Sequence, residues 1–307
     1  MIVEVTKKRG RHLGWQENYI GWLYCLPIII GILAFTLLPI LLSIYSMFVD
    51  WSGGTSVLDA KFVGMQNFKT IFSGSYKKTF WPALGNTFFM MLNLPVSMFL
   101  GVLLALAMNR KMPGAKVFRV LYYVPCITSV VAVTILFQKM FSTTGVINTL
   151  FGRLDNPIQW LTDDVLVKVT VIIFCVWKGV GYSTLMYLAG LQSVSTDQIE
   201  AAKMDGADSK KIFFKITIPA LYPITFYLLV TGVMGGLQIF NEPYILAGYG
   251  RGDNAMTNAS LIYRFFKPER GGTPHAGLAA VAAWALALLV FIVTAIQMVV
   301  DNKKEKY

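Results

Sequence analysis

The strongest constraint on this chain is a set of six long stretches made almost entirely of apolar residues. A membrane hydrocarbon core about 30 Å thick requires about 20 such residues in each helix that crosses it. All six stretches meet that length, and their apolar residues run continuously instead of alternating, which favours helices over a β-barrel. The sequence therefore predicts an all-α, polytopic transmembrane bundle of six helices, at residues 20–49, 84–108, 120–141, 166–190, 218–240 and 277–300.

The composition agrees with a chain that is solvated by lipid. Hydrophobic residues make up 55% of the 307 residues and charged residues 14%, and the mean hydropathy is +0.58, which is too apolar for a soluble domain. The first stretch follows four basic residues, but it is longer than the roughly 7–15 residues of a signal-peptide core, so we expect it to remain in the mature protein. Pro27 and Pro39 inside it predict a bent or broken helix.

Lysine and arginine residues predict the orientation of the bundle. With the N-terminus in the cytoplasm, fifteen of them fall on the inner segments and nine on the longer outer segments, as the positive-inside rule requires. We therefore expect both termini in the cytoplasm, with residues 1–19 as a cytoplasmic segment, residues 20–300 as the transmembrane domain and residues 301–307 as a cytoplasmic tail. Contact with the anionic inner leaflet explains the formal net charge of +11, so no nucleic-acid partner is expected.

No catalytic or metal-binding arrangement is visible in the sequence. Cys25, Cys126 and Cys175 fall inside the apolar stretches without metal-ligand spacing, and we interpret them as small, buried packing residues. Only two histidines are available, and no nucleotide-binding or hydrolase motif occurs. We therefore expect neither an enzyme nor a metal site.

The longest charged run between two apolar stretches is EAAKMDGADSKKIFFKITIP, residues 200–219. Ser195 and Gln198 match a capping box, which predicts a short helix that begins near Thr196. Gly206 is expected to end that helix, with the neighbouring aspartates as turn or cap residues, and a second short helix is expected to follow. The sequence thus predicts a compact helix-turn-helix.

The composition of this helix-turn-helix favours docking against protein. Four acidic residues balance four lysines, so attraction to lipid headgroups does not hold it in place. Small residues next to Glu200 allow a second helix to approach closely, and Phe213 and Phe214 are expected to anchor the segment to the bundle. We therefore expect it to lie in a protein groove on the cytoplasmic face.

The same segment resembles a known family signature. Glu200-Ala201-Ala202 is followed after three residues by Gly206, and after nine more by Ile216-x-Ile218-Pro219. This spacing is similar to the EAA loop of bacterial binding-protein-dependent ABC importer permeases, although Ile218 stands where leucine is usual. The Gly-Tyr pair at residues 181–182 and the sequence of residues 240–244 look like the sugar-importer branch of that family, specifically its maltose-permease-like first subunit.

The resemblance implies a type I ABC importer permease in the bacterial inner membrane. Such a chain forms half of the translocation pathway with a second permease subunit and couples to two ATPase subunits, which hold ATP and Mg. An extracytoplasmic solute-binding protein delivers the solute, a sugar and in particular an oligosaccharide. The chain itself is expected to bind no cofactor. Its coupling loop, residues 192–217, is expected to bear on the ATPase through residues in and just after it: Glu200, Ala201, Ala202, Asp205, Gly206, Ala207 and Pro219.

The resemblance also implies a solute site near the middle of the membrane, on the fourth and fifth stretches. Aromatic faces and neutral hydrogen-bonding groups there suit a sugar. The expected pathway residues are Cys175, Lys178, Gly179, Tyr182, Gly235, Gly236, Gln238, Ile239 and Asn241. Two simpler interpretations remain open: Trp177 and Tyr182 pack between helices, and the two adjacent glycines permit close helix contact.

Lys178 is unusual because it places a cation about midway along an apolar stretch. Such groups are costly in lipid and normally face the bundle interior or a water-filled cavity. Three interpretations remain open. Lys178 pairs with Glu242 or with a carboxylate of the partner subunit, or it lines the pathway of an acidic or sulfated sugar, or its side chain extends to the membrane surface or the boundary of the predicted helix is misplaced.

Two alternative functions also remain. An ion-coupled secondary transporter has a similar number of helices, but ion coupling usually requires paired acidic residues within the membrane, which these stretches lack. An ABC importer permease for a non-sugar or acidic-sugar solute is the second alternative.

Overall fold

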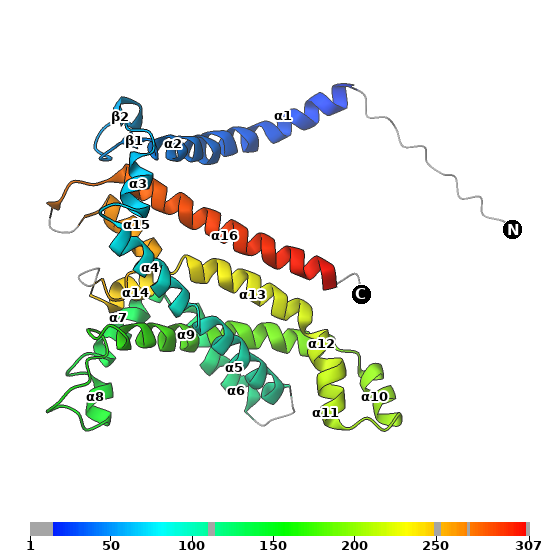
Figure 1. Ribbon diagram of the computed structural model, residues 1–307. Helices are drawn as coiled ribbons and strands as arrows, with labels where there is room; N and C mark the ends of the chain where they lie inside the picture. The colour runs from blue at the N-terminus through cyan, green and yellow to red at the C-terminus, as the bar shows by residue number, and fades with distance from the viewer. Residues whose placement is uncertain (1–14, 110–113, 249–252, 269–270, 305–307) are drawn as a thin grey trace.

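A computed structural model describes residues 15–109, 114–248, 253–268 and 271–304, which form a helical bundle (Figure 1). Within these ranges, four helical spans are long and apolar enough to cross a membrane: Gly21–Ser46, Lys77–Met108, Leu166–Ser193 and Ala276–Asp301. Two further spans are bent helix pairs, Val117–Ile127 with Val130–Met140 and Ser209–Ala220 with Tyr222–Leu237. The predicted all-α bundle is confirmed, with up to six spans when each bent pair counts as one.

The first span is continuous where a break was expected. It comprises α1 (Trp15–Ile32), the π-helical turn η1 (Leu33–Leu37) and α2 (Leu38–Ser46). Pro27 lies inside α1 without interrupting it, and the π-helical turn comes directly before Pro39. A proline ring clashes with the carbonyl four residues earlier and lacks an N–H. One wider turn therefore accommodates Pro39 without breaking the helix.

The second and third spans are both interrupted. The second consists of α4 (Lys77–Met90) and α5 (Asn93–Met108), and the third of α6 (Ala115–Ile127) and α7 (Val130–Met140). The prediction of one uninterrupted third helix is wrong, because α6 and α7 are bent by 98°. The bend occurs at Thr128 and Ser129, which adopt extended backbone angles.

The fourth span, α9 (Leu166–Ser193), lies at the centre of the bundle and packs extensively against α5. The two backbones approach closely, because a β-carbon added at Gly101 would lie 2.6 Å from the Ser183 Cβ. The fifth span consists of α12 (Ile218–Ala220) and α13 (Tyr222–Leu237), and the sixth is α16 (Ala276–Lys304), which extends past the expected end of the transmembrane domain.

Short elements at one end of the bundle form structure that the sequence analysis did not predict. Two short strands, β1 (Val49–Asp50) and β2 (Lys61–Phe62), pair antiparallel. The same end of the bundle also contains η2 (Val57–Asp59), α3 (Gln66–Phe72), α8 (Val146–Leu150), α14 (Asn241–Leu246) and α15 (Asn258–Phe266) (Figure 1). In the segment before the sixth span, Leu246, Leu261 and Phe265 are buried. An amphipathic helix, α15, buries its apolar side against α16.

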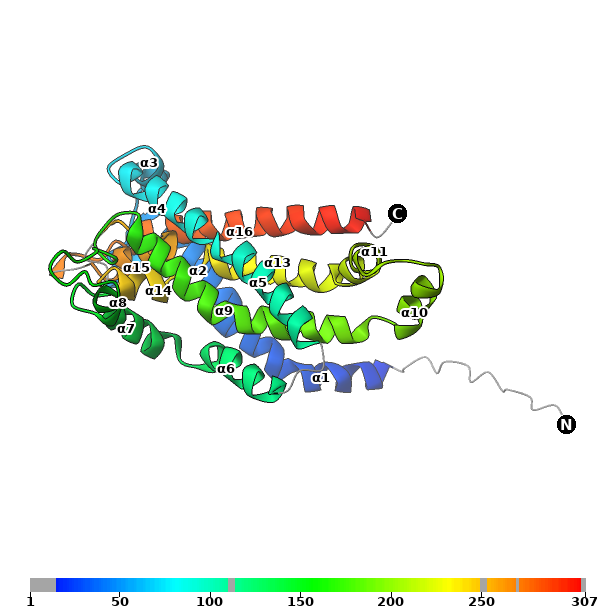
Figure 2. The same ribbon diagram turned by 90° about the horizontal axis from the view of Figure 1, so that it is seen from below.

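The two ends of the described chain lie at the same end of the bundle. Figure 2 shows the start of α1, the end of α16 and helices α10 (Thr196–Met204) and α11 (Ser209–Ile212) at one end of the bundle, opposite α3, α8, α14 and α15. Residues 1–14 and 305–307, which include most of the expected N-terminal segment and the end of the expected tail, lie outside the described residues. Helix α1 stands apart from the other helices (Figure 1), whereas α2 contacts α16. None of the apolar window of the first span is buried.

The close contact between α5 and α9 generates a prediction. Replacing Gly101 by alanine places a methyl group against Ser183 and its backbone, and overpacking of this kind costs about 1–3 kcal/mol. We expect Gly101→Ala to lower the thermal unfolding temperature of the detergent-purified protein. Gly85→Ala is the matched control, because nothing lies within 4 Å of the added β-carbon. An equal loss of stability in both variants would contradict the packing described here.

Candidate functional site

The helix-turn-helix expected around Gly206 is present as two short helices, α10 and α11, here termed the α10–α11 hairpin (residues 196–212). The helix α10 begins at Thr196, as predicted, but the Ser195 side chain makes no capping hydrogen bond. At its other end the Ala207 N–H donates to the Ala202 oxygen at 2.9 Å and the Gly206 N–H to the Lys203 oxygen at 3.0 Å. This bond pair is a Schellman motif.

Gly206 permits that motif because its φ is +78°, in the left-handed region, which costs glycine little and other residues more. Asp208 then starts α11, and its carboxylate accepts a hydrogen bond from the Lys211 N–H at 2.8 Å. The expected roles of Gly206 and Asp208 as turn and cap residues are therefore confirmed. Together they fix the angle between the two short helices.

The second half of the hairpin runs directly into the fifth span. A π-helical turn, η3 (Phe213–Thr217), joins α11 to α12 and precedes Pro219, as η1 precedes Pro39 in the first span. Two residues later the chain bends by 52° at Leu221 and continues as α13. The hairpin is therefore joined to α13 by helical backbone without an intervening loop.

Most of the predicted docking residues face outward. Glu200, Ala201, Asp205, Gly206 and Pro219 are exposed, and Ala202 and Ala207 are half-buried. The expectation that Phe214 anchors the hairpin is wrong, because 66% of its surface is exposed, whereas Phe213 is half-buried. Met204 was not singled out from the sequence, yet it is 89% exposed at the end of α10. The hairpin thus presents both apolar and acidic groups outside the bundle.

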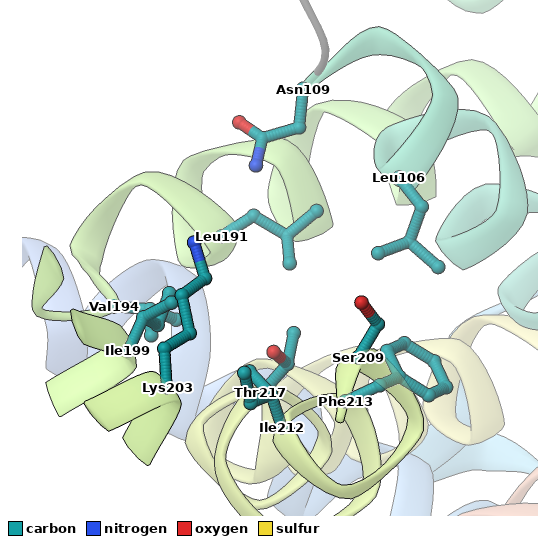
Figure 3. A pocket seen from close by; sticks show the side chains of 10 residues that line it. All are labelled: Leu106, Asn109, Leu191, Val194, Ile199, Lys203, Ser209, Ile212, Phe213 and Thr217. Carbon is teal, nitrogen blue, oxygen red and sulfur yellow. The ribbon is translucent and has the colours of Figure 1, made fainter. Parts of the chain in front are cut away.

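A cavity of about 400 Å³ separates the hairpin from the bundle (Figure 3). Leu106 and Leu191, near the ends of α5 and α9, form part of its apolar wall, and Phe213 contributes from the hairpin. Lys203 also lines it, and the hairpin lysines form no ion pair within the part of the chain that the structure describes. The hairpin is therefore connected to the bundle mainly through the backbone at its two ends.

The expected pathway residues on α9 are divided between an exposed face and helix contacts. The Tyr182 hydroxyl lies 3.2 Å from the Tyr227 hydroxyl of α13, and these side chains are 40% and 45% exposed. Trp177, also 40% exposed, packs its ring against Phe137 at 5.2 Å. Tyr227 was not predicted, because nothing in the sequence indicates which tyrosine of the fifth span faces α9.

The remaining expected pathway residues do not form one site. Gly179 lies against Ser97 of α5, and Gly236 against Met91, so both allow close helix contact. Gly235, in contrast, faces open space. Ile239 is buried, and Cys175 packs beside the same apolar cluster.

Two polar residues after the fifth span also lie apart from Tyr182. The Gln238 amide donates to the Met234 oxygen of its own helix and lines a groove between α13 and α16. Asn241 is half-buried at the start of α14. The expectation that every cysteine is buried is also wrong, because Cys25 is exposed on α1.

Lys178 makes contacts that none of its three interpretations anticipated. Its ammonium group donates to backbone oxygens of Pro125, Cys126 and Thr128, and it forms no ion pair with Glu242. Burial raises the pKa of the Glu242 carboxyl, while a hydrogen bond from its own N–H and the charge of Lys178 oppose this to a smaller extent. The two groups therefore interact only at a distance.

The caps of the hairpin generate a prediction with an internal control. Asp208→Ala removes a bonded cap, which costs about 1 kcal/mol of local helix stability. We expect faster hydrogen exchange at the amides of residues 209–212. Ser195→Ala removes a side chain that makes no capping bond, so exchange in α10 should not change. The opposite pattern would show that the two caps have been misassigned.

Comparison with known proteins gives this geometry a context. A family model described as binding-protein-dependent transport system inner membrane component matches residues 97–306. The lactose transport system permease protein LacF of Rhizobium radiobacter is 32% identical, over 93% of this chain and 95% of that protein. The multiple sugar-binding transport system permease protein MsmF of Streptococcus mutans is 28% identical, over 94% and 96%.

Further similarity comes from a second bacterial permease and from a solved structure. The probable ABC transporter permease protein YesP of Bacillus subtilis (strain 168) is 32% identical, over 92% of this chain and 90% of that protein. A bacterial ABC transporter involved in the import of the acidic polysaccharide alginate matches with a TM-score of 0.77 and 23% identity, over 94% of this chain and 96% of that chain. That similarity concerns the fold alone. With the family match across most of the chain, the protein belongs to the binding-protein-dependent transport system inner membrane component family, the membrane permeases of ABC transport systems.

Proposed function

We propose that this chain is the permease subunit of an ATP-driven, binding-protein-dependent importer for a sugar, and specifically for an oligosaccharide. The ATP-driven mechanism rests on one observation, the exposed α10–α11 hairpin, in which a Schellman motif ends α10 and Asp208 caps the start of α11. The sugar assignment is supported by the relatives described above, of which those named for a solute are named for sugars.

In this proposal the hairpin docks against a separate ATPase subunit. Its outward-facing residues, the ones expected from the sequence, form the contact: Glu200, Ala201, Ala202, Asp205, Gly206, Ala207 and Pro219. Exposed Met204 and Phe214 add apolar surface, which suits a protein groove better than water. ATP and Mg are bound by two such ATPase subunits, and closure of these subunits moves the hairpin and, through the continuous backbone of η3 and α12, the fifth span. This chain binds no cofactor and catalyses no reaction itself.

A second permease subunit completes the pathway. The first span has an apolar window of which none is buried within the chain, and α1 and α2 expose large side chains such as Trp22 and Phe35. Lipid covers part of such a helix, and a partner helix of the same family covers the rest. The groove between α13 and α16 is a further apolar surface of this kind.

The orientation follows from the hairpin. Docking on an ATPase requires the hairpin end of the bundle to lie in the cytoplasm, and the start of α1 and the end of α16 lie at that same end (Figure 2). We therefore propose a bacterial inner-membrane protein with cytoplasmic termini. At the opposite end, α3, α8, α14 and α15 form the surface that receives the extracytoplasmic solute-binding protein.

The solute passes beside the exposed aromatic face of α9 and α13. Tyr182 and Tyr227 present rings and hydroxyl groups at this face, and sugars bind to such combinations. Gly235 also faces open space. Of the other expected pathway residues, Gly179, Gly236 and Ile239 contribute to helix packing.

The hairpin supplies the decisive test. Gly206→Val forces a β-branched residue to a φ of +78°, which is strongly unfavourable, and Glu200→Lys reverses an exposed charge. We expect both variants to insert into the membrane normally and to lose solute-stimulated ATPase activity and uptake in the assembled importer. Gly206→Asn is the matched control, because asparagine tolerates the left-handed region. Normal transport by the Val and Lys variants would disprove the coupling role.

The energy source separates this function from that of an ion-coupled transporter. We expect sugar uptake to stop when the partner ATPase carries an inactivating substitution and to continue when an ionophore collapses the ion gradient while ATP is maintained. Uptake with the reverse dependence would favour the secondary transporter.

The aromatic face generates a prediction for the solute. Tyr182→Ala removes a ring and its hydroxyl, and we expect the KM for uptake to rise about tenfold, since one factor of ten corresponds to roughly 1.4 kcal/mol of lost contact. Tyr182→Phe keeps the ring and should retain most of the affinity. The ATPase activity without solute should not change in either variant. An unchanged KM for Tyr182→Ala would remove this face from the pathway.

A further inference from the structure

The break in the third span leaves backbone carbonyls without helical partners. The helix α6 ends at Ile127, and the chain turns by 98° before α7 begins. The last four carbonyls of any α-helix lack an intrahelical N–H, and in hydrocarbon each unsatisfied group costs several kcal/mol. A bend at this position therefore requires hydrogen-bond donors from elsewhere in the protein.

Side chains supply most of those partners. The Thr128 hydroxyl donates to the Val124 oxygen at 2.6 Å. The Lys178 ammonium donates to the oxygens of Pro125 at 3.0 Å and Cys126 at 3.4 Å, and beyond the helix end to that of Thr128 at 2.8 Å. Three of the four terminal carbonyls are thus bonded, two of them by one cation.

The charge of Lys178 suits this position as well as its donors do. The C-terminus of a helix has a partial negative charge, which stabilises a nearby cation. An ammonium group has three N–H donors and no acceptor, and all three are directed at the backbone of residues 125–128. The contact reduces two free-energy costs at once: that of a cation within the membrane and that of backbone carbonyls without hydrogen-bond donors.

A second contact holds the same part of α6 against α9. A β-carbon added at Gly181 would lie only 2.3 Å from the Tyr122 oxygen, so the backbones of the two helices touch there. Lys178 and Gly181 are one turn apart on α9, and Tyr182, with its bond to Tyr227, is their neighbour. The position of the end of α6 is therefore fixed beside the aromatic face.

We propose that Lys178 is a positioning residue that clamps the bent third span onto α9. It sets the angle between α6 and α7 beside the solute face and makes no contact with the solute itself. Because its three donors are engaged by the backbone, the ammonium group is not free to bind an acidic sugar. The transport consequence rests on the proposed function, whereas the structural consequence, the α6–α7 angle, does not.

The test measures that angle directly. In the assembled importer, with the native cysteines replaced by alanine, spin labels at Leu121→Cys on α6 and Leu136→Cys on α7 report the distance across the bend, since both positions are exposed. We expect a single narrow distribution with Lys178, a shifted and broadened one in Lys178→Met, and partial recovery in Lys178→Arg. Lys168→Met is the matched control, because Lys168 lies on α9 but bonds to Asn86 of α4.

Transport kinetics supply the second readout. We expect Lys178→Met to lower the maximal uptake rate about tenfold, the factor that corresponds to one lost hydrogen bond to a charged group. The KM should stay unchanged for neutral and uronate oligosaccharides alike. An unchanged distance distribution would overturn the clamp, and so would a loss that appears only in the KM for uronates, which would place Lys178 on the pathway.

A further variant covers the case in which Lys178→Met fails to assemble. Lys178→Gln keeps two N–H donors without the charge, and we expect a broadened distance distribution and reduced uptake. A Gln variant with the distribution and uptake of the unaltered protein would overturn the clamp. If the distances shift as expected but neither the unaltered protein nor Lys168→Met transports sugar under any condition, the clamp stands and the proposed function fails.

Discussion

Backbone carbonyls that lose their helical partners inside hydrocarbon must find new ones within the protein, and this requirement governs each irregular feature of the bundle. Before Pro39 and Pro219 the helix widens into a π-helical turn and continues. At the break after Ile127 the helix ends, and the side chains of Thr128 and Lys178 donate hydrogen bonds to the freed carbonyls. The chain thus uses two different repairs, one that keeps a helix continuous and one that stabilises a bend.

These repairs have different mechanical consequences. Continuity through η3 and α12 links the α10–α11 hairpin to the fifth span by helical backbone, which suits the transmission of movement proposed above. The third span, by contrast, is held by side-chain donors on its neighbour α9, so its angle depends on a tertiary contact. The helix α9 is therefore central, because it packs on α5, holds the end of α6 and places Tyr182 against Tyr227 of α13.

The hairpin is rigid within itself and loosely attached to the bundle. A Schellman motif ends α10 and an aspartate cap begins α11, so the angle between them is fixed locally. A cavity separates the hairpin from the ends of α5 and α9. Both properties suit the coupling role proposed above, because a coupling element must move as one body without deforming the spans beside it. The exposed first span and the exposed hairpin leave surface for the partner subunits proposed above.

The sequence by itself determined the spans, their number and the hairpin, because these depend on local properties: apolar length, proline, a glycine with positive φ and capping aspartates. It also identified the family, through residues 200–219. Only the tertiary structure decided how the third span bends, that Lys178 bonds to carbonyls and not to Glu242, and that Tyr227 joins Tyr182. These outcomes depend on which helix faces lie together, and a nearly uniform apolar stretch contains too little periodicity to reveal its neighbours.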